Sequence, residues 1–306
     1  MNKSSSIAVL QKKISWEEVD KKYLNSLLQL CLEEEVTKNY FQFPSQGDIS
    51  TKSSNVSGTA HANFVTREKI VCSGLNIYPH IFEVFGTSNL NFLKLCEDGE
   101  NASSNSIIAK IEGDISEILL IERTLLNFIQ RLSGIATFTE SIVQKIERYN
   151  VNLLDTRKTT PGMRYLEKYA TGCGGGYNHR LGLHDRILIK DNHLASRNIK
   201  NKSDLISFAK EVRRKSPNTF IEIEVDSIEF ALALTSNEVN AVLLDNFNLE
   251  DVVHVRKKID QEVIIEVSGG ISSSNIGDYA SCRPDFISTG APTHSSRWVD
   301  IGLDWY

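Results

Sequence analysis

The sequence predicts an α/β protein whose larger, C-terminal part is built on a parallel sheet. After Asn150, short apolar runs recur, and each ends abruptly in charged, hydroxyl or glycine residues. Helical stretches such as LEDVVHVRKKI separate most of these runs. Buried strands that alternate with helices are typical of a parallel sheet with crossover helices. Before residue 117, short β-like stretches alternate imperfectly, which indicates a half-exposed antiparallel sheet.

The N-terminal elements are expected to be short. The first dozen residues are expected to be frayed, and residues 16–35 follow with helical periodicity. Residues 47–58 are polar and turn-rich, which predicts a loop or a hairpin connection. The β-like stretches that come next are ANFVTREKIVCSGL, HIFEVFG, NFLKLCEDGE and SIIAKIEGD.

A change of pattern at residues 117–140 marks the expected domain boundary. This segment is apolar around most of its circumference, as a buried helix would be. We place one domain at residues 1–122 and a second at 123–306, and expect residues 294–306 to pack back on the first. The apolar runs of the second domain are VNLLDTRK, RILIKDNH, FIEIEVDS, AVLLDNF, VIIEVSGG and DFISTGA. No G-x-G-x-x-G follows the first run, which disfavours a dinucleotide-binding sheet.

Composition and charge exclude several classes of protein. The chain has 306 residues, of which 41% are hydrophobic, an ordinary globular composition. Its net charge of -5 gives no general basic field, so neither nucleic acid nor a membrane is an expected partner. The five cysteines are scattered without C-x-x-C spacing, and no signal peptide or long apolar stretch is present. A soluble, reduced, cytoplasmic protein is therefore expected.

Several positive side chains follow the apolar runs or a glycine-rich segment. In α/β barrels, residues at the carboxyl ends of the strands form the active site. One such residue alone is usually a solvated surface group. A whole set beside buried strands predicts a ligand with several negative charges, and Lys190 and Arg123 are the least surface-like members. The set is Arg123, Arg157, Lys158, His179, Arg180 and Lys190.

Carboxylates and glycine loops complete the candidate site. Glu224 and Asp245 end successive apolar strands, where they can bind ribose hydroxyls, hold a divalent cation or stabilise a cationic transition state. A simple salt bridge between Glu224 and Lys190 is an equally good interpretation. The last two strands close with Ser268-Gly269-Gly270 and Thr289-Gly290-Ala291, where barrels frequently bind phosphate. His193 is expected to orient Lys190 or to cap a helix.

A long central block of the sequence resembles a known family. LLDTRKTTPGMRYLEKYATGCGGGYNHRLGLHDRILIKDNH is similar to the central block of the quinolinate phosphoribosyltransferases. IERTLLNFIQRLSGIAT resembles that family's interdomain helix, and IEIEVDS, VLLDNF, IEVSGGI and ISTGAPTHS resemble its later strand ends in the same order. The resemblance covers roughly residues 60–306. Pro292 interrupts a run that usually reads GALTHS, and His184 and Arg186 replace smaller residues.

The resemblance implies both a fold and an activity. The fold would be an α/β sandwich-like N-terminal domain followed by an incomplete α/β barrel. The activity would be transfer of phosphoribosyl from phosphoribosyl pyrophosphate to quinolinate with decarboxylation, which yields nicotinate mononucleotide for NAD biosynthesis. Mg²⁺ would be required and no organic cofactor. The enzyme would act as a homodimer, or a multiple of one, with an active site shared between subunits.

The resemblance also implies roles for individual residues. Arg157, His179, Arg180 and Lys190 would surround the dicarboxylate, and Arg123 would come from the neighbouring subunit. Lys158 would lie between substrate and donor, while Glu224 and Asp245 would serve the ribose and magnesium. Phosphate would be held by Ser268, Gly269, Gly270 and Gly290. Lys158, Lys190, Glu224 and Asp245 would form the catalytic group.

Three other functions fit parts of the pattern. A molybdenum-transport-associated homologue of the same fold keeps the TRKT, PG and HR motifs, but Lys190 is expected to be altered in that group. A barrel aldolase would use Lys190 to form a Schiff base. A non-catalytic anion-binding protein would have little use for two carboxylates beside a full set of cations.

Overall fold

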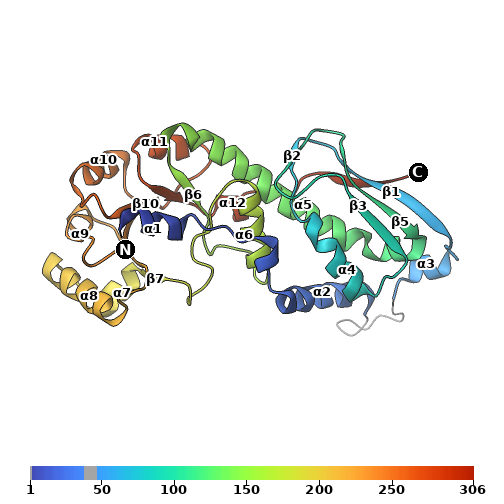
Figure 1. Ribbon diagram of the computed structural model, residues 1–306, viewed down its shortest axis with the longest axis horizontal. Coiled ribbons are helices and arrows are strands. Elements are labelled where there is room, and N and C mark those ends of the chain that lie inside the picture. The colour runs from blue at the N-terminus through green and yellow to red at the C-terminus, as the bar shows by residue number, and fades with distance from the viewer. Residues whose placement is uncertain (1, 38–46) are drawn as a thin grey trace. The chain divides into compact units, whose positions relative to one another are not determined.

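The computed structural model describes residues 2–37 and 47–306, which form two compact units (Figure 1). The barrel unit comprises Met1–Lys13, Thr139–Thr160 and Gly176–Ser295. The sandwich unit comprises Ile14–Phe138, Pro161–Gly175 and Ser296–Tyr306. Helix α5 (Ile115–Ile146) runs without interruption through residues 122 and 123. The two units are defined by contacts, and the domain boundary expected after residue 122 stays a prediction.

A six-stranded parallel sheet forms the centre of the barrel unit. Its strands lie in the order β6-β11-β10-β9-β8-β7. Strands β6 and β7 stand at the two ends of this order, and within the described residues they do not pair with each other. The sheet is therefore open, which confirms the expected incomplete barrel. The strands are β6 (Asn152–Leu154), β7 (Ile187–Ile189), β8 (Ile221–Val225), β9 (Ala241–Asp245), β10 (Ile264–Ser268) and β11 (Phe286–Ser288).

Short helices connect these strands on the outside of the sheet (Figure 1). Helix α8 begins after Asn201, whose side chain accepts the backbone N–H of Asp204, and α10 begins after Asn248 in the same way. Both helices carry three basic residues in the last turn, where they complement the helix dipole. The helices are α7 (Asp191–Ser196), α8 (Lys202–Lys215), α9 (Ile228–Ala231), α10 (Leu249–Lys258), α11 (Ile276–Ser281) and α12 (Ala291–His294), with the 3-10 turn η3 (Glu147–Tyr149) after α5.

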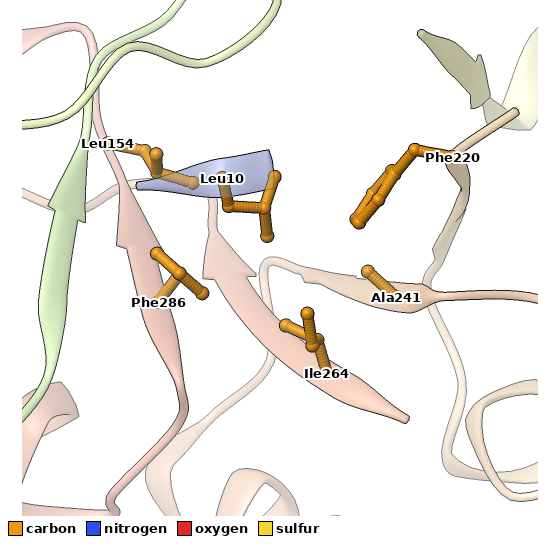
Figure 2. Packing of buried hydrophobic residues seen from close by; sticks show 6 residues of the cluster. All are labelled: Leu10, Leu154, Phe220, Ala241, Ile264 and Phe286. Atoms are coloured by element: carbon orange, nitrogen blue, oxygen red, sulfur yellow. The ribbon is translucent and has the colours of Figure 1, made fainter. Parts of the chain in front are cut away.

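The N-terminal helix α1 (Lys3–Leu10) closes the amino end of this sheet. Figure 2 shows the Leu10 side chain among buried residues that include Ala241, Ile264 and Phe286, the first residues of β9, β10 and β11. Leu10 is 0% exposed. The expectation of a frayed N-terminus is therefore wrong, because burial of one leucine anchors a helix whose other residues are mostly polar.

An antiparallel sheet forms the centre of the sandwich unit. Its four strands lie in the order β12-β1-β5-β3, and a two-stranded sheet pairs β2 with β4. The C-terminal strand β12 pairs with β1, so that Trp305 lies opposite Ala62. The strands are β1 (Thr59–Thr66), β2 (Ile70–Val71), β3 (Leu90–Lys94), β4 (Asn101–Ala102), β5 (Ile107–Asp114) and β12 (Ile301–Trp305).

The helices of the sandwich unit include one that the sequence pattern did not predict. HIFEVFG was expected to be β-like, but Tyr78–Phe85 form helix α4, which begins with a proline in its first turn and ends at Gly86 in a left-handed conformation. It packs on α2 (Lys21–Val36), the main part of the helix predicted at residues 16–35 (Figure 1). The remaining helices are η1 (Trp16–Glu18), α3 (Ile49–Ser53), η2 (Leu75–Ile77) and α6 (Arg164–Cys173).

Candidate active site

Side chains at the carboxyl ends of the barrel strands line a cavity of about 530 Å³. Parallel strands bring these ends to one edge of the sheet, so residues from distant parts of the chain meet there. The charged lining residues are Arg157, Lys158, Arg180, Lys190, Glu224, Asp245 and Glu266. The others are Thr156, His179, Leu188, Leu243, Asn246, Ser268, Gly269, Gly270 and Ser288. Of the predicted site residues, all but Arg123 and Gly290 line this cavity.

Two arginines in the cavity wall form no salt bridge within the described residues. The Nε atom of Arg157 is buried and has no hydrogen-bond partner among the described residues. Arg180 is 7% exposed, and burial lowers the pKa of its guanidinium, with the charge of Arg157 as the next cause. Like charges held together in this way destabilise the protein unless an anion binds between or beside them. The pair therefore indicates an anionic ligand.

Lys190 forms a salt bridge with Glu224, which was one of the two interpretations that the sequence allowed. Its Nζ lies 2.6 Å from Oε2 of Glu224, and the Lys190 side chain is 42% exposed. The backbone N–H of Lys190 donates to Nδ1 of His193, 2.9 Å away, at the start of α7. His193 therefore caps the helix and fixes the backbone from which Lys190 projects.

Asp245 and a glycine loop lie together at the ends of β9 and β10. The Asn246 side chain donates to Oδ2 of Asp245 at 2.8 Å. Gly269 has a φ of +90°, and a Cβ added there would lie 2.3 Å from Asn246 Oδ1 and 2.6 Å from the Asn246 backbone nitrogen. No side chain fits at this position. The glycine thus allows the loop Ser268 to Gly270 to approach Asp245 closely.

Lys158 and Gly290 meet at the other side of the site. The carbonyl of Lys158 accepts a hydrogen bond of 2.6 Å from the hydroxyl of Thr293 in α12. A Cβ added to Gly290 would lie 3.2 Å from Cδ of Lys158 and 2.8 Å from Cδ2 of His294. Gly290 does not line the cavity, but it gives the exposed Lys158 side chain room to lie against the chain.

The segment that carries His179 and Arg180 is held beside β6. Tyr177 forms a parallel bridge with Leu154, which extends the sheet past its edge strand by one residue. The buried carboxylate of Asp155 then accepts the backbone N–H of His179 at 2.8 Å and the Asn178 side chain at 2.9 Å. These bonds hold the backbone just before Arg180 in place, and so help to orient the Arg180 side chain.

Two glutamates beside His179 were not predicted as site residues. Glu266 lines the cavity and Glu222 lies behind it, and both side chains are 0% exposed. Burial raises the pKa of Glu222, and so does the charge of Glu266. Burial acts on Glu266 too, but the adjacent His179 ring and the charge of Arg186 hold the pKa of Glu266 below its usual value. The sequence signal that could have found Glu222 and Glu266 is a glutamate inside an otherwise apolar strand, because a buried carboxylate is rare unless a charged or hydrogen-bonding group lies beside it.

Arg123 is the predicted site residue whose surroundings differ most from expectation. It was expected to be among the least surface-like cations, but its side chain is exposed on α5. It belongs to the sandwich unit, whereas the cavity belongs to the barrel unit. The apolar residues around it in the sequence lie on the other faces of the helix, where Leu125 and Ile129 are fully buried.

The sequence matches two family models that together cover most of the chain. Residues 48–133 match the model described as "Quinolinate phosphoribosyl transferase, N-terminal domain". Residues 135–304 match "Quinolinate phosphoribosyl transferase, C-terminal domain". The matched segments meet within α5, and α1 with its buried Leu10 precedes both.

Individual proteins show the same similarity. The chain is 38% identical over 262 residues to a nicotinate-nucleotide pyrophosphorylase [carboxylating] from Mycobacterium leprae, an alignment of 84% of this chain and 90% of that protein. The structure of the nicotinate-nucleotide pyrophosphorylase from Francisella tularensis superposes with a TM-score of 0.85 at 33% identity, covering 94% of this chain and 98% of the other. The Ehrlichia chaffeensis structure gives 0.83 at 32% identity, covering 96% and 100%.

Proposed function

Because the chain belongs to the quinolinate phosphoribosyl transferase family, we propose that it transfers phosphoribosyl from phosphoribosyl pyrophosphate to quinolinate. The products are nicotinate mononucleotide, carbon dioxide and pyrophosphate. The observation that carries this proposal is the pair Arg157 and Arg180 in the cavity wall, which forms no salt bridge within the described residues. Quinolinate supplies two adjacent carboxylates, which match two guanidinium groups in charge and in geometry.

The cations also bring two anions together. Quinolinate and phosphoribosyl pyrophosphate repel each other in water, and a cation-lined cavity offsets that repulsion and fixes the geometry of attack. Lys158, exposed at the cavity edge, is placed to contact both. Backbone N–H groups of the loop Ser268 to Gly270 would hold the donor's 5′-phosphate.

The first chemical step is a displacement at the anomeric carbon. The ring nitrogen of quinolinate forms a bond to this carbon, and the bond to pyrophosphate breaks, with positive charge developing on the ribose. Glu224 is 12% exposed in its side chain and lies at the end of β8. Its carboxylate stabilises that developing charge, and Lys190 keeps it oriented through the 2.6 Å ion pair.

The second step is decarboxylation. The ring nitrogen is now quaternary and positive, so it stabilises the electron pair left on the neighbouring carbon as carbon dioxide departs. A proton then replaces the carboxylate at that carbon. This chemistry needs no organic cofactor, because the substrate ring itself acts as the electron sink.

Magnesium would be held with the donor at the acidic side of the cavity. Asp245 and Glu224 offer carboxylate oxygens, the ligand type that Mg²⁺ prefers, so the residues present fit the ion. Glu224 is already paired with Lys190, whereas the Asp245 carboxylate forms no salt bridge within the described residues and accepts a hydrogen bond from its neighbour Asn246. Asp245 is therefore the better ligand. When bound, Mg²⁺ neutralises charge on the leaving pyrophosphate.

A homodimer with shared active sites is part of the proposal. Arg123 is exposed, as a residue offered to a neighbouring subunit must be. Mixing Arg123→Ala with Lys190→Ala subunits would create mixed dimers with one intact site. A random equal mixture should recover about a quarter of the wild-type activity, because half of the dimers are mixed and each has one good site. No recovery after verified subunit exchange would contradict sharing.

We also propose a cytoplasmic location. All five cysteines are free, which suits a reducing compartment. In the part of the chain that the structure describes, no helix combines the length and apolar character needed to cross a bilayer.

The decisive assay supplies quinolinate, phosphoribosyl pyrophosphate and magnesium and follows product formation. Nicotinate mononucleotide and carbon dioxide should appear in equal amounts. Absence of both from a folded protein that binds quinolinate would reject the enzymatic proposal. The aldolase alternative is disfavoured because Lys190 is held in an ion pair, where a protonated amine cannot attack a carbonyl. Borohydride trapping with a carbonyl substrate would detect it.

A further inference from the structure

The His179 ring is fixed by contacts on both of its nitrogens. Its Nδ1 accepts the backbone N–H of Arg180 at 2.8 Å. Its Nε2 lies 3.3 Å from Oε2 of Glu222 and 3.4 Å from Oε1 of Glu266. The His179 side chain is 7% exposed and both glutamates are 0% exposed. Strands β8 and β10 and the loop that carries His179 therefore meet at this ring.

These contacts specify one tautomer. An Nδ1 that accepts a hydrogen bond carries no proton, so the ring proton must be on Nε2, where it faces the two carboxylates. Burial lowers the pKa of His179, but Glu266 and Glu222 together outweigh burial and raise it. A doubly protonated ring would nevertheless place Nδ1–H against the N–H of Arg180 at 2.8 Å, donor against donor. The geometry therefore requires the neutral Nε2–H form.

The surroundings favour an electrostatic cluster of side chains over a metal site. His179, Glu222 and Glu266 present ligand-type atoms within 4.8 Å of one another, a spacing that a metal ion also accepts. Arg186, however, is 6% exposed, and its charge acts on both glutamates and on His179. A cation already buried beside the carboxylates makes a further dication unfavourable.

We propose that Glu222 and Glu266 are positioning residues for the quinolinate end of the cavity. They hold His179 as its Nε2–H tautomer, and the ring in turn accepts from, and so fixes, the backbone of Arg180. Glu222 does not line the cavity, so its replacement acts on substrate binding through the His179 ring and through the charge that it exerts on the Arg180 guanidinium. The tautomer stands on geometry alone, while the link to quinolinate rests on the proposed function.

The first test needs no variant and no activity. In protein labelled with ¹⁵N-histidine, long-range ¹H–¹⁵N correlation spectra distinguish the two neutral tautomers and the imidazolium. At neutral pH, His179, assigned with the His179→Gln variant, should show the Nε2–H pattern. An Nδ1–H pattern or an imidazolium overturns the proposal. So does one tightly held divalent ion per chain, found by elemental analysis and lost in the Glu222→Gln variant.

The second test separates a positioning role from a merely structural one. Glu222→Leu removes one of the two carboxylates that face Nε2–H and should raise the quinolinate KM about tenfold, the size of effect expected from losing an interaction with a charged group. Glu222→Gln keeps an acceptor oxygen and should stay within about threefold of wild type. The KM for phosphoribosyl pyrophosphate should change little in either variant.

Glu238→Gln is the matched control. Glu238 is 5% exposed in the same unit, bonds to Thr235 and does not line the cavity. Its replacement should leave both KM values unchanged. Equal quinolinate KM values for Glu222→Leu and wild type overturn the positioning role. If no variant and no wild-type protein turns over quinolinate, the proposed function fails, whereas the spectra still decide the tautomer.

Discussion

Replacement of Arg180 by methionine should weaken quinolinate binding without destabilising the protein. The Arg180 guanidinium is buried beside that of Arg157, and it forms no hydrogen bond within the described residues. Methionine has a similar length and no charge, so the protein without substrate loses the repulsion between Arg180 and Arg157 and keeps most of its side-chain packing. Its unfolding free energy should be unchanged or up to about 2 kcal/mol higher.

The magnitude of the binding loss follows from the bonds that the substrate would lose. Two charge-assisted hydrogen bonds between a guanidinium and a carboxylate contribute together about 3 kcal/mol. This corresponds to an increase of about a hundredfold in the quinolinate KM. Steady-state kinetics with each substrate varied in turn, together with urea unfolding followed by circular dichroism, would measure both quantities.

Arg213 provides a control with the opposite outcome. Its guanidinium donates to the carbonyls of Thr219 and Glu238 and to the Asn240 side chain, at 2.9, 3.2 and 2.7 Å. Arg213→Met should therefore lower the unfolding free energy by about 2–4 kcal/mol and leave the quinolinate KM unchanged. The reasoning is refuted if Arg180→Met is destabilised as much as Arg213→Met, or if it binds quinolinate like wild type.

Three further predictions concern the sheet end, the glycine loop and a helix cap. Leu10→Ala should lower the unfolding free energy by about 2–4 kcal/mol, because Leu10 is 0% exposed. Val9→Ala, at a position that is 40% exposed, should change it by less than about 0.5 kcal/mol, and denaturant midpoints would measure both values. Gly269→Ala should lower kcat/KM for phosphoribosyl pyrophosphate at least about tenfold, because the added Cβ would lie 2.6 Å from the backbone nitrogen of Asn246. Gly277→Ala, where nothing lies within 4 Å of the added Cβ, should leave kcat/KM unchanged in the same assay. The hydroxyl and N–H of Ser116 lower the pKa of Asp114 from 3.8, so the Asp114 carboxylate stabilises the fold above pH 3.8. This stabilisation is lost as the pH falls through the folded-state pKa, so Asp114→Asn should lose less unfolding free energy than wild type in an acid titration.

Much of the candidate site was predictable because barrel strands end in a recognisable way. A buried apolar run followed at once by charged or glycine residues predicts a strand whose carboxyl end carries chemistry. Lys190, Glu224, Asp245 and the loop Ser268 to Gly270 follow this rule, and the structure brings them to one cavity. The parallel sheet followed from the same pattern, whereas its openness was implied by the family resemblance.

The errors have identifiable physical causes. HIFEVFG spans only two helical turns, and over so few residues the spacing of aromatic and aliphatic side chains does not separate a strand from helix α4. At the N-terminus, polarity hid the helix, because only Leu10 and Ser6 of α1 are buried. Arg123 lies among apolar residues in sequence, yet a helix can expose one residue while it buries its neighbours.

The buried glutamates were missed for a different reason. Glu222 and Glu224 are two residues apart on β8 and so share a face of the strand, but a shared face does not say what lies opposite it. Its partner His179 is brought near by the bridge between Tyr177 and Leu154, a contact between segments that no local pattern encodes. Glu266 was passed over because its strand ends in a conspicuous glycine loop.

Strand β12 has a consequence for synthesis on the ribosome. Strand β1 pairs along one edge with β5, which emerges soon after it, but along its other edge with residues 301–305, which are translated only after the strands of the barrel unit. While the residues between β5 and β12 are translated, one side of β1 therefore carries unpaired N–H and C=O groups that can recruit another nascent chain. A chain truncated before Ile301 would leave that side open permanently, and such a product should self-associate even though every residue of the catalytic cavity is present.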